Sequence, residues 1–328
     1  MSSPDLHEQR ERPALDETLR LLQLAGEGAV TADIVYGLNS LTDEEAGVIG
    51  ASWPSLDEDV RRRVVLALSE AGEADFELDF TAIGRLVLND PASPVRTLAI
   101  ELLWEDTSLD VMSALLEMAH ADEAAEVRAA AASALGPFIL MGELGEIDSA
   151  LFERAQELLL EIYADEREDT EVRRRALEAV ANSSHEAVED AILDAFQSED
   201  RRLQVSSLFA MGRTADDRWA AIVLDELDDE DHELRYEAAR AAGELELEDA
   251  IPALTQIAFD DEVELRDVAV WALGEIGGRE SLRVLNQLGD EARENEDEEL
   301  LSAIEDAIAM ASLGGDSAFY LMDTDDGN

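Results

Sequence analysis

Histidine–glutamate pairs are the first candidates for chemistry in this sequence. Three of the four histidines precede a glutamate, in His7-Glu8, His185-Glu186 and His232-Glu233. Imidazole nitrogens and carboxylate oxygens are ordinary ligands of iron and zinc, so pairs of this kind can build a metal centre. These pairs lie in dissimilar places: the first in a polar N-terminal segment, the other two at the starts of two different types of predicted helix. Because they cannot converge symmetrically, we predict no metal site.

Other motifs for catalysis are missing from the sequence. The chain of 328 residues has no cysteine, which excludes thiol catalysis, disulfides, iron–sulfur clusters and cysteine-ligated zinc. It has no phosphate-binding loop, no dinucleotide-binding glycine motif and no nucleophile elbow. The acidic end Asp323–Gly327 lacks the spacing and the downstream glutamate of a calcium loop. We therefore predict a protein that is not an enzyme and that holds no cofactor.

A repeated segment organises most of the chain. Its clearest copies begin at Val127, Leu234 and Leu265, and each has an arginine, then alanines at fixed spacing, then a glycine. The arginine position falls at Arg61, Arg96, Arg128, Arg173, Gln204, Arg235 and Arg266. The successive intervals are 35, 32, 45, 31, 31 and 31 residues. A period near 31 residues accommodates two short helices and two turns, and stacked units of this kind form a solenoid.

Each marked segment has the pattern of an amphipathic helix. Relative to the arginine, positions −1, +3, +4 and +7 are apolar, as in Leu265, Ala269, Val270 and Leu273, and this spacing falls on one helical face. Alanines at +3 and +6 predict close approach of neighbouring helices. Glycines at +8 follow the apolar stripe, and we expect them to cap the C-terminal ends of the helices. They are Gly136, Gly212, Gly243 and Gly274.

Shorter apolar segments lie between the marked helices and predict their partner helices. They span residues 190–196, 220–224 and 250–257. No useful length of sequence alternates polar and apolar residues as a strand does. The predicted fold class is all-α, a right-handed α-solenoid (α-α superhelix) of helical hairpins. We expect each arginine to reach an acid in a neighbouring turn and so to connect the repeats.

The V-R-x-x-A-x-x-A-L-G segments resemble HEAT repeats, in particular the short bacterial kind also seen in phycobilin lyase subunits. The resemblance covers roughly Asp57 to Gly314. It implies a curved stack of HEAT-like hairpins that binds partners along its concave side. One HEAT-repeat family, the deoxyhypusine hydroxylases, binds two irons through His-Glu pairs at equivalent helix starts, which the pairs of this chain do not occupy. A phycobilin-lyase-like subunit and a HEAT-type metal hydroxylase remain the alternative functions.

The sequence divides into four segments. We predict a disordered N-terminus over 1–13, degenerate N-terminal capping helices over 14–56, the HEAT-repeat array over 57–312 and an acidic C-terminal tail over 313–328. Terminal repeats are expected to be atypical, because their outer faces meet water. The 45-residue interval holds about 14 extra residues around Gly136 to Gly145, which form either a loop on the binding face or a lengthened helix pair.

The charge of the chain is extreme. It has 79 acidic residues against 24 basic ones, all arginine, for a net charge of −55. Such a composition is typical of proteins of salt-loving microbes, where salt screens the self-repulsion, but it also suits a basic partner. The spread of the acids over the whole chain favours salt adaptation. Nucleic-acid binding is excluded by the scarcity of cations, and the lack of a long apolar run predicts a cytoplasmic protein without a membrane segment.

Positions +1 and +5 of the marked helices carry the candidate binding residues. The buried stripe does not need these positions, and in HEAT arrays they line the concave surface. Aromatic and arginine side chains dominate binding hot spots. We predict a partner-binding surface of Arg174, Phe209, Tyr236, Arg240 and Trp271 at these positions, which Trp104 at position +8 joins from the rim. The alternative is that the aromatic side chains pack between neighbouring helices. The predicted function is a non-catalytic scaffold that binds an unidentified protein or peptide.

Overall fold

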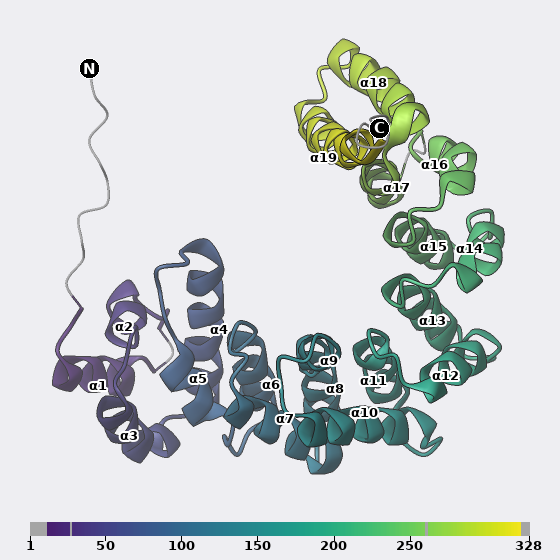
Figure 1. The fold of residues 1–328 in the computed structure, drawn as a ribbon. Helices are drawn as coiled ribbons and strands as arrows, with labels where there is room; N and C mark the ends of the chain where they lie inside the picture. The colour runs from purple at the N-terminus through teal and green to yellow at the C-terminus, as the bar shows by residue number, and fades with distance from the viewer. Residues whose placement is uncertain (1–11, 27, 260–261, 323–328) are drawn as a thin grey trace, which may run out of the picture. The chain divides into compact units, whose positions relative to one another are not determined.

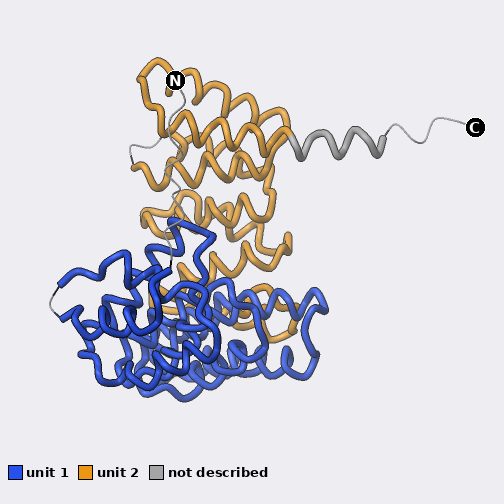
Figure 2. Tube along the Cα trace, turned by 90° about the vertical axis from the view of Figure 1, so that its left-hand side faces the viewer, with its two compact units in different colours: residues 1–179 blue, residues 180–328 orange. Residues whose placement is uncertain are grey.

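Every regular element in the described part of the chain is helical. A computed structural model describes residues 12–26, 28–259 and 262–322 (Figure 1), and these ranges contain α-helices, short 3-10 turns and no strand. This confirms the prediction of an all-α solenoid. The helices form two compact units, residues 1–179 and 180–328 (Figure 2). Each unit is a stack of helical hairpins and is described by itself.

Unit 1 begins with three helices that precede the regular hairpins. The helices of unit 1 are α1 (Leu15–Leu24), α2 (Ala32–Gly37), α3 (Asp43–Ser52), α4 (Glu58–Ala74), α5 (Thr81–Val87), α6 (Ser93–Leu102), α7 (Leu109–Ala121), α8 (Ala125–Ala134), α9 (Gly136–Glu143), α10 (Ser149–Ala164) and α11 (Thr170–Val180). The helices α4, α6 and α8, which carry the marked arginines, pack side by side.

Unit 2 contains the most regular hairpins of the chain. Its helices are α12 (Glu186–Phe196), α13 (Arg201–Arg213), α14 (Ala220–Glu226), α15 (His232–Glu244), α16 (Ile251–Ile257), α17 (Val263–Ile276), α18 (Gly278–Glu294) and α19 (Glu298–Met322). The helices α13, α15, α17 and α19 form one row, and α12, α14, α16 and α18 each pack against the helix that follows them (Figure 1). Equivalent positions of successive repeats therefore lie beside one another along the row.

The glycines at position +8 do not cap the helices, so our prediction for them is wrong. Gly212, Gly243 and Gly274 lie inside α13, α15 and α17, and Gly136 is the first residue of α9. A Cβ atom on Gly243 would lie 2.8 Å from the Cα atom of the next repeat's alanine, Ala272. Gly212, Gly243 and Gly274 are needed because the backbone of the next repeat lies so close that it leaves no room for a side chain.

The same glycine–alanine contact recurs along unit 2. A Cβ on Gly212 would lie 2.9 Å from Cα of Ala241, and one on Gly274 would lie 3.0 Å from Cα of Ala307. Ala241 and Ala272 occupy position +6, where the sequence predicted close approach, and this prediction is confirmed. The left-handed residue that ends α17 is Gly277, with φ of 63°, three positions after the expected capping glycine.

Arg61, Arg96 and Arg128 connect the repeats of unit 1 as predicted, whereas Arg173 donates to the backbone carbonyl of Tyr163. Arg61 donates hydrogen bonds to the carboxylate of Asp90, with Nε–Oδ2 at 2.8 Å and Nη2–Oδ1 at 3.1 Å. Arg96 donates to the backbone carbonyl of the same Asp90 at 2.8 Å and to the carboxylate of Asp122 at 2.7 and 2.8 Å. Arg128 repeats this geometry with the carbonyl of Asp122. The turns at Asp90 and Asp122 are therefore each held by two successive arginines.

The arginine connections of unit 2 differ from those of unit 1. Arg235, for which we expected a carboxylate, instead donates to the backbone carbonyls of Asp229 and Glu230. In the repeat where glutamine replaces the marked arginine, Arg201 makes the connection, with Nε 2.7 Å from Oδ2 of Asp231. That hydrogen bond lowers the pKa of Asp231 to about 2. Asp231 also caps α15 by accepting from the backbone N–H of Glu233.

The irregular parts of the sequence are largely helical as well. The extra residues after Gly136 form the short helix α9, which packs against α8 and α10. The segment 313–328, predicted as a tail, continues α19 as far as Met322. Of the segment predicted to be disordered, residues 1–11 lie outside the described residues, as do residues 323–328 at the other end.

Candidate partner-binding site

Four of the six predicted binding residues lie together in unit 2. Tyr236 and Arg240 on α15 and Trp271 on α17 line a groove of about 560 Å³. Phe209 on α13 extends this row, because the guanidinium of Arg240 lies 4.2 Å from the centre of its ring. All four side chains are half-buried. They pack against the row of helices and still keep part of their surface open to a ligand.

Repeat geometry explains why these side chains meet. Positions +1 and +5 are four residues apart and therefore share one face of a helix. The glycine–alanine contacts fix the register of α15 against α17, so Tyr236 and Arg240 face the equivalent positions of the next repeat. Trp271 itself lies close to this contact, since a Cβ on Gly243 would be 2.9 Å from its Cζ3 atom. The predicted positions thus form one continuous surface within unit 2.

Arg240 is held rigidly in the groove. Its Nη2 atom donates to Oε1 of Glu244 at 3.0 Å, and its Nη1 atom lies 3.6 Å from Oε2 of Glu237. Its stacking on Phe209 adds a cation–π contact, and Arg213 approaches the same ring at 5.7 Å. An arginine fixed in this way offers a planar charged surface without the loss of side-chain entropy that a free arginine incurs on binding.

Two further residues of the groove, Glu264 and Val268, were not identified from the sequence, whereas Asp267 occupies position +1. Glu264, Asp267 and Val268 of α17 complete its lining. Together with Trp271 they occupy positions −2, +1, +2 and +5, which follow the i, i+3, i+4, i+7 pattern of one helical face. Applying this helical spacing to positions +1 and +5 would have identified Glu264 and Val268. The groove therefore combines aromatic, arginine and acidic groups.

The other two predicted residues, Trp104 and Arg174, belong to unit 1. Trp104 follows α6, and its side chain is 65% exposed. Arg174 on α11 contacts Glu171 at 2.8 Å and Glu178 at 3.8 Å. Its neighbour Arg175, rather than Arg174 itself, lines a pocket together with Trp104. A change of one residue rotates a side chain by about 100° around a helix, which the sequence pattern did not resolve.

His185 and His232 have local structural contacts. Nδ1 of His185 accepts a hydrogen bond from the backbone N–H of Ala187 at 3.2 Å and caps α12. Nε2 of His232 lies 2.7 Å from Oε2 of Glu262. Among the described residues, no three histidine or acidic side chains are grouped so that they could hold a metal ion. His7 lies outside the described residues.

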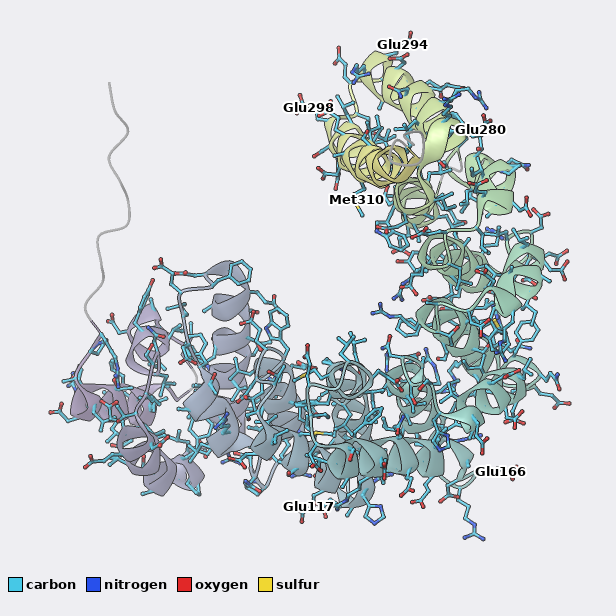
Figure 3. All side chains as sticks on the ribbon, in the orientation of Figure 1. Glu117, Glu166, Glu280, Glu294, Glu298 and Met310 are labelled. Atoms are coloured by element: carbon cyan, nitrogen blue, oxygen red, sulfur yellow. The ribbon has the colours of Figure 1, made fainter. Side chains whose placement is uncertain are left out.

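Carboxylates are distributed over both units. Figure 3 labels exposed glutamates on α7 (Glu117), after α10 (Glu166), on α18 (Glu280 and Glu294) and at the start of α19 (Glu298). They extend away from the helices that carry them, without collecting on one element. Within the described helices, none combines the length and the apolar character that crossing a bilayer requires.

Comparison with known proteins identifies the repeat type in unit 2. Residues 220–309 match the family model of HEAT repeats. The resemblance read from the sequence is therefore confirmed for the hairpins from α14 into α19. The glycine–alanine contacts of Gly243 and Gly274 lie within the matched residues. No curated protein matches the chain in sequence.

Solved structures resemble the chain in their helical repeats. Importin beta is 14% identical over 90% of this chain and 45% of its own, with a TM-score of 0.49. Human deoxyhypusine hydroxylase is 17% identical over 82% of this chain and 96% of its own, with a TM-score of 0.35. A designed armadillo repeat protein is 17% identical over 60% of this chain and 98% of its own, with a TM-score of 0.37. Similarities at this level carry no information on function.

Proposed function

We propose that this chain is a non-catalytic scaffold that binds a segment of another protein. The binding surface is the unit-2 groove, made by Tyr236, Arg240 and Trp271 with Phe209 beside it, on the helix row that we expect to form the concave face. One observation carries the proposal: residues predicted from repeat position alone converge on one groove of about 560 Å³. A groove of this volume falls in the range that accommodates a few side chains of a peptide.

The composition of the groove supports a polypeptide ligand. Tryptophan, tyrosine and arginine are the residue types that most often dominate protein–protein affinity. Their planar surfaces pack against an apolar side chain, while Glu264 and Asp267 are placed to accept hydrogen bonds from a ligand at the edge of the groove. Because Arg240 is already anchored by Glu244 and Phe209, the surface is organised before the ligand arrives.

A double substitution tests this function. Tyr236→Ala with Trp271→Ala should reduce recovery of the natural partner from the native cell extract by at least roughly tenfold, because each truncated hot-spot residue typically costs about 2 kcal/mol or more. The measurement is quantitative mass spectrometry of proteins retained by the full chain at the salt concentration of the native cell.

A matched control separates binding from folding. Phe259→Ala removes another aromatic side chain of unit 2, one that is 43% exposed and does not line the groove. It should retain the partner, and both variants should keep the circular dichroism of the unmodified chain. Equal recovery with the double variant and the unmodified chain, with the fold intact, rules out the groove as the binding surface.

A further inference from the structure

Unit 1 carries a second, separate candidate surface centred on Trp104. Its exposed ring lies between two pockets, one of about 540 Å³ and one of about 470 Å³. The larger pocket is predominantly apolar, with Ile100, Val111 and Phe138 among its lining residues. Phe76, whose side chain is 80% exposed, lines the smaller pocket. Two large aromatic side chains are thus exposed to solvent close to each other. Such an exposed aromatic cluster is unusual unless a ligand covers it.

Carboxylates surround this aromatic surface. Glu101 lines both pockets, and Glu70, Glu73 and Glu105 line the smaller one. The apolar walls raise the pKa of Glu101 above its ordinary value even though its side chain remains exposed, and the charge of Glu73 raises it further. The ionised form of Glu101 is therefore held in a place that disfavours it.

No arginine of the described chain compensates these charges. Arginine connects to acids throughout the molecule, yet no ion pair joins Glu73 or Glu101 to an arginine among the residues that the structure describes. Arg175, the one arginine that lines either of the two pockets, is bound to Glu171 at 2.9 Å and to Glu178 at 2.8 Å. A ligand that compensates the negative charge of this surface must therefore carry a positive charge.

The aromatic and apolar residues of the same surface restrict which kind of cation can bind there. A small inorganic cation would satisfy the carboxylates but would leave Trp104, Phe76 and the apolar pocket in water. An acidic or neutral apolar ligand would fill the pocket and would leave Glu101 uncompensated. A lysine or arginine side chain next to an apolar one satisfies both requirements, and its charged end stacks favourably on the face of an indole ring.

We propose that the Trp104 surface binds a basic amphipathic segment of a partner protein. Apolar side chains of that segment enter the pocket beside Phe138, and its lysine or arginine side chains lie over Trp104 and against Glu73 and Glu101. This site is distinct from the unit-2 groove, which has an arginine, Arg240, among its lining residues. It gives the scaffold a second binding surface with a different ligand chemistry.

Synthetic peptides test the proposal with the full chain. The probe is a fluorescently labelled peptide with leucine at helical i, i+3, i+4, i+7 spacing and lysine elsewhere, followed by fluorescence anisotropy. Trp104→Ala should weaken its binding by roughly tenfold or more, as expected for an exposed aromatic anchor. Glu73→Gln with Glu101→Gln should weaken it by a similar factor, and the effect should shrink at high salt. A peptide with glutamate in place of lysine should not bind.

Two controls distinguish the site from the general acidity of the chain. Glu153→Gln with Glu166→Gln removes the same charge from exposed positions of unit 1 outside both pockets and should change the affinity less than about twofold. A scrambled peptide of the same composition should bind weakly. The Tyr236→Ala, Trp271→Ala variant should bind the probe as the unmodified chain does, which keeps this test independent of the unit-2 groove.

Four results would overturn the proposal. They are failure of the unmodified chain to bind the basic amphipathic peptide, equal weakening by the two glutamate double variants, undiminished binding by Trp104→Ala, and equal binding of the scrambled peptide. Sedimentation adds a further check: if Trp104→Ala dissociates a dimer of the unmodified chain, the surface is covered by a second copy and the proposal is wrong.

Discussion

Asp90→Ala should destabilise unit 1 by about 3–5 kcal/mol, the range observed when one partner of a buried ion pair is removed. The side chain of Asp90 is completely buried, and that of Arg61 is 7% exposed. The Asp90 carboxylate accepts from the guanidinium of Arg61, from Nε1 of Trp53 at 2.8 Å and from the backbone N–H of Ala92 at 2.9 Å. The substitution leaves the buried Arg61 without its counter-ion, although its Nη1 atom still donates to the carbonyl of Leu56. It also leaves two buried donors without an acceptor, and each of these losses carries a desolvation cost.

The free energy of unfolding is measured by urea denaturation followed by circular dichroism, with hydrogen exchange in α4 and α6 to place the loss in unit 1. Glu280→Ala is the matched control, because it removes a carboxylate that contacts Arg283 on the exposed surface, and it should leave the midpoint unchanged. Adding Arg61→Met to Asp90→Ala should recover part of the loss, since no unpaired charge then remains buried. Equal midpoints for Asp90→Ala and Glu280→Ala would contradict the arginine connections described here.

Gly243→Ala should destabilise unit 2 by about 1–3 kcal/mol, the usual cost of forcing an extra carbon into a packed interior. The new Cβ would lie 2.8 Å from Cα of Ala272 and 2.9 Å from Cζ3 of Trp271, so α15 and α17 must separate. Since Trp271 lines the unit-2 groove, the same substitution should also weaken partner binding.

Gly47→Ala provides the opposite case. Gly47 lies within α3, is exposed, and has no atom within 4 Å of the position that a Cβ would occupy. The substitution should stabilise the chain by up to about 1 kcal/mol, because alanine favours a helix over glycine by that amount. Thermal melts of the two variants at equal salt compare them directly. A stabilising effect of Gly243→Ala similar to that of Gly47→Ala would show that the helices are not in close contact at position +8.

The repeat was readable from the sequence because one pattern had several copies. The apolar stripe at −1, +3, +4 and +7 identified the marked helices, and the alanine at +6 identified where they touch. The glycine at +8 was misread because a glycine that ends a helix and one that meets a neighbouring backbone look alike in a single chain. The difference lies in the distance between Gly243 and Ala272, which no local pattern contains.

Long-range partners were less predictable than the helices. The sequence indicated that Arg61 reaches an acid of a neighbouring turn, but not that Asp90 would also bind Trp53. Trp104 was predicted as a binding residue and Glu101 occupies position +5 of the same repeat, whereas Phe76 was missed. Phe76 lies beside Trp104 because the end of α4 packs against the end of α6, and this depends on how two hairpins pack. Because acidic residues are so abundant, the sequence did not indicate which of them lack an arginine partner.

Site-specific photo-crosslinking in the native cell tests the central claim most directly, that the row formed by α13, α15 and α17 presents the binding groove. A photo-reactive benzophenone side chain replaces Trp271 in one variant and Phe259 in the other, so that both retain an aromatic group in unit 2. We predict a discrete covalent adduct with a partner protein from position 271 and none from position 259. Adducts from position 259 alone, or none from either position, would contradict the account.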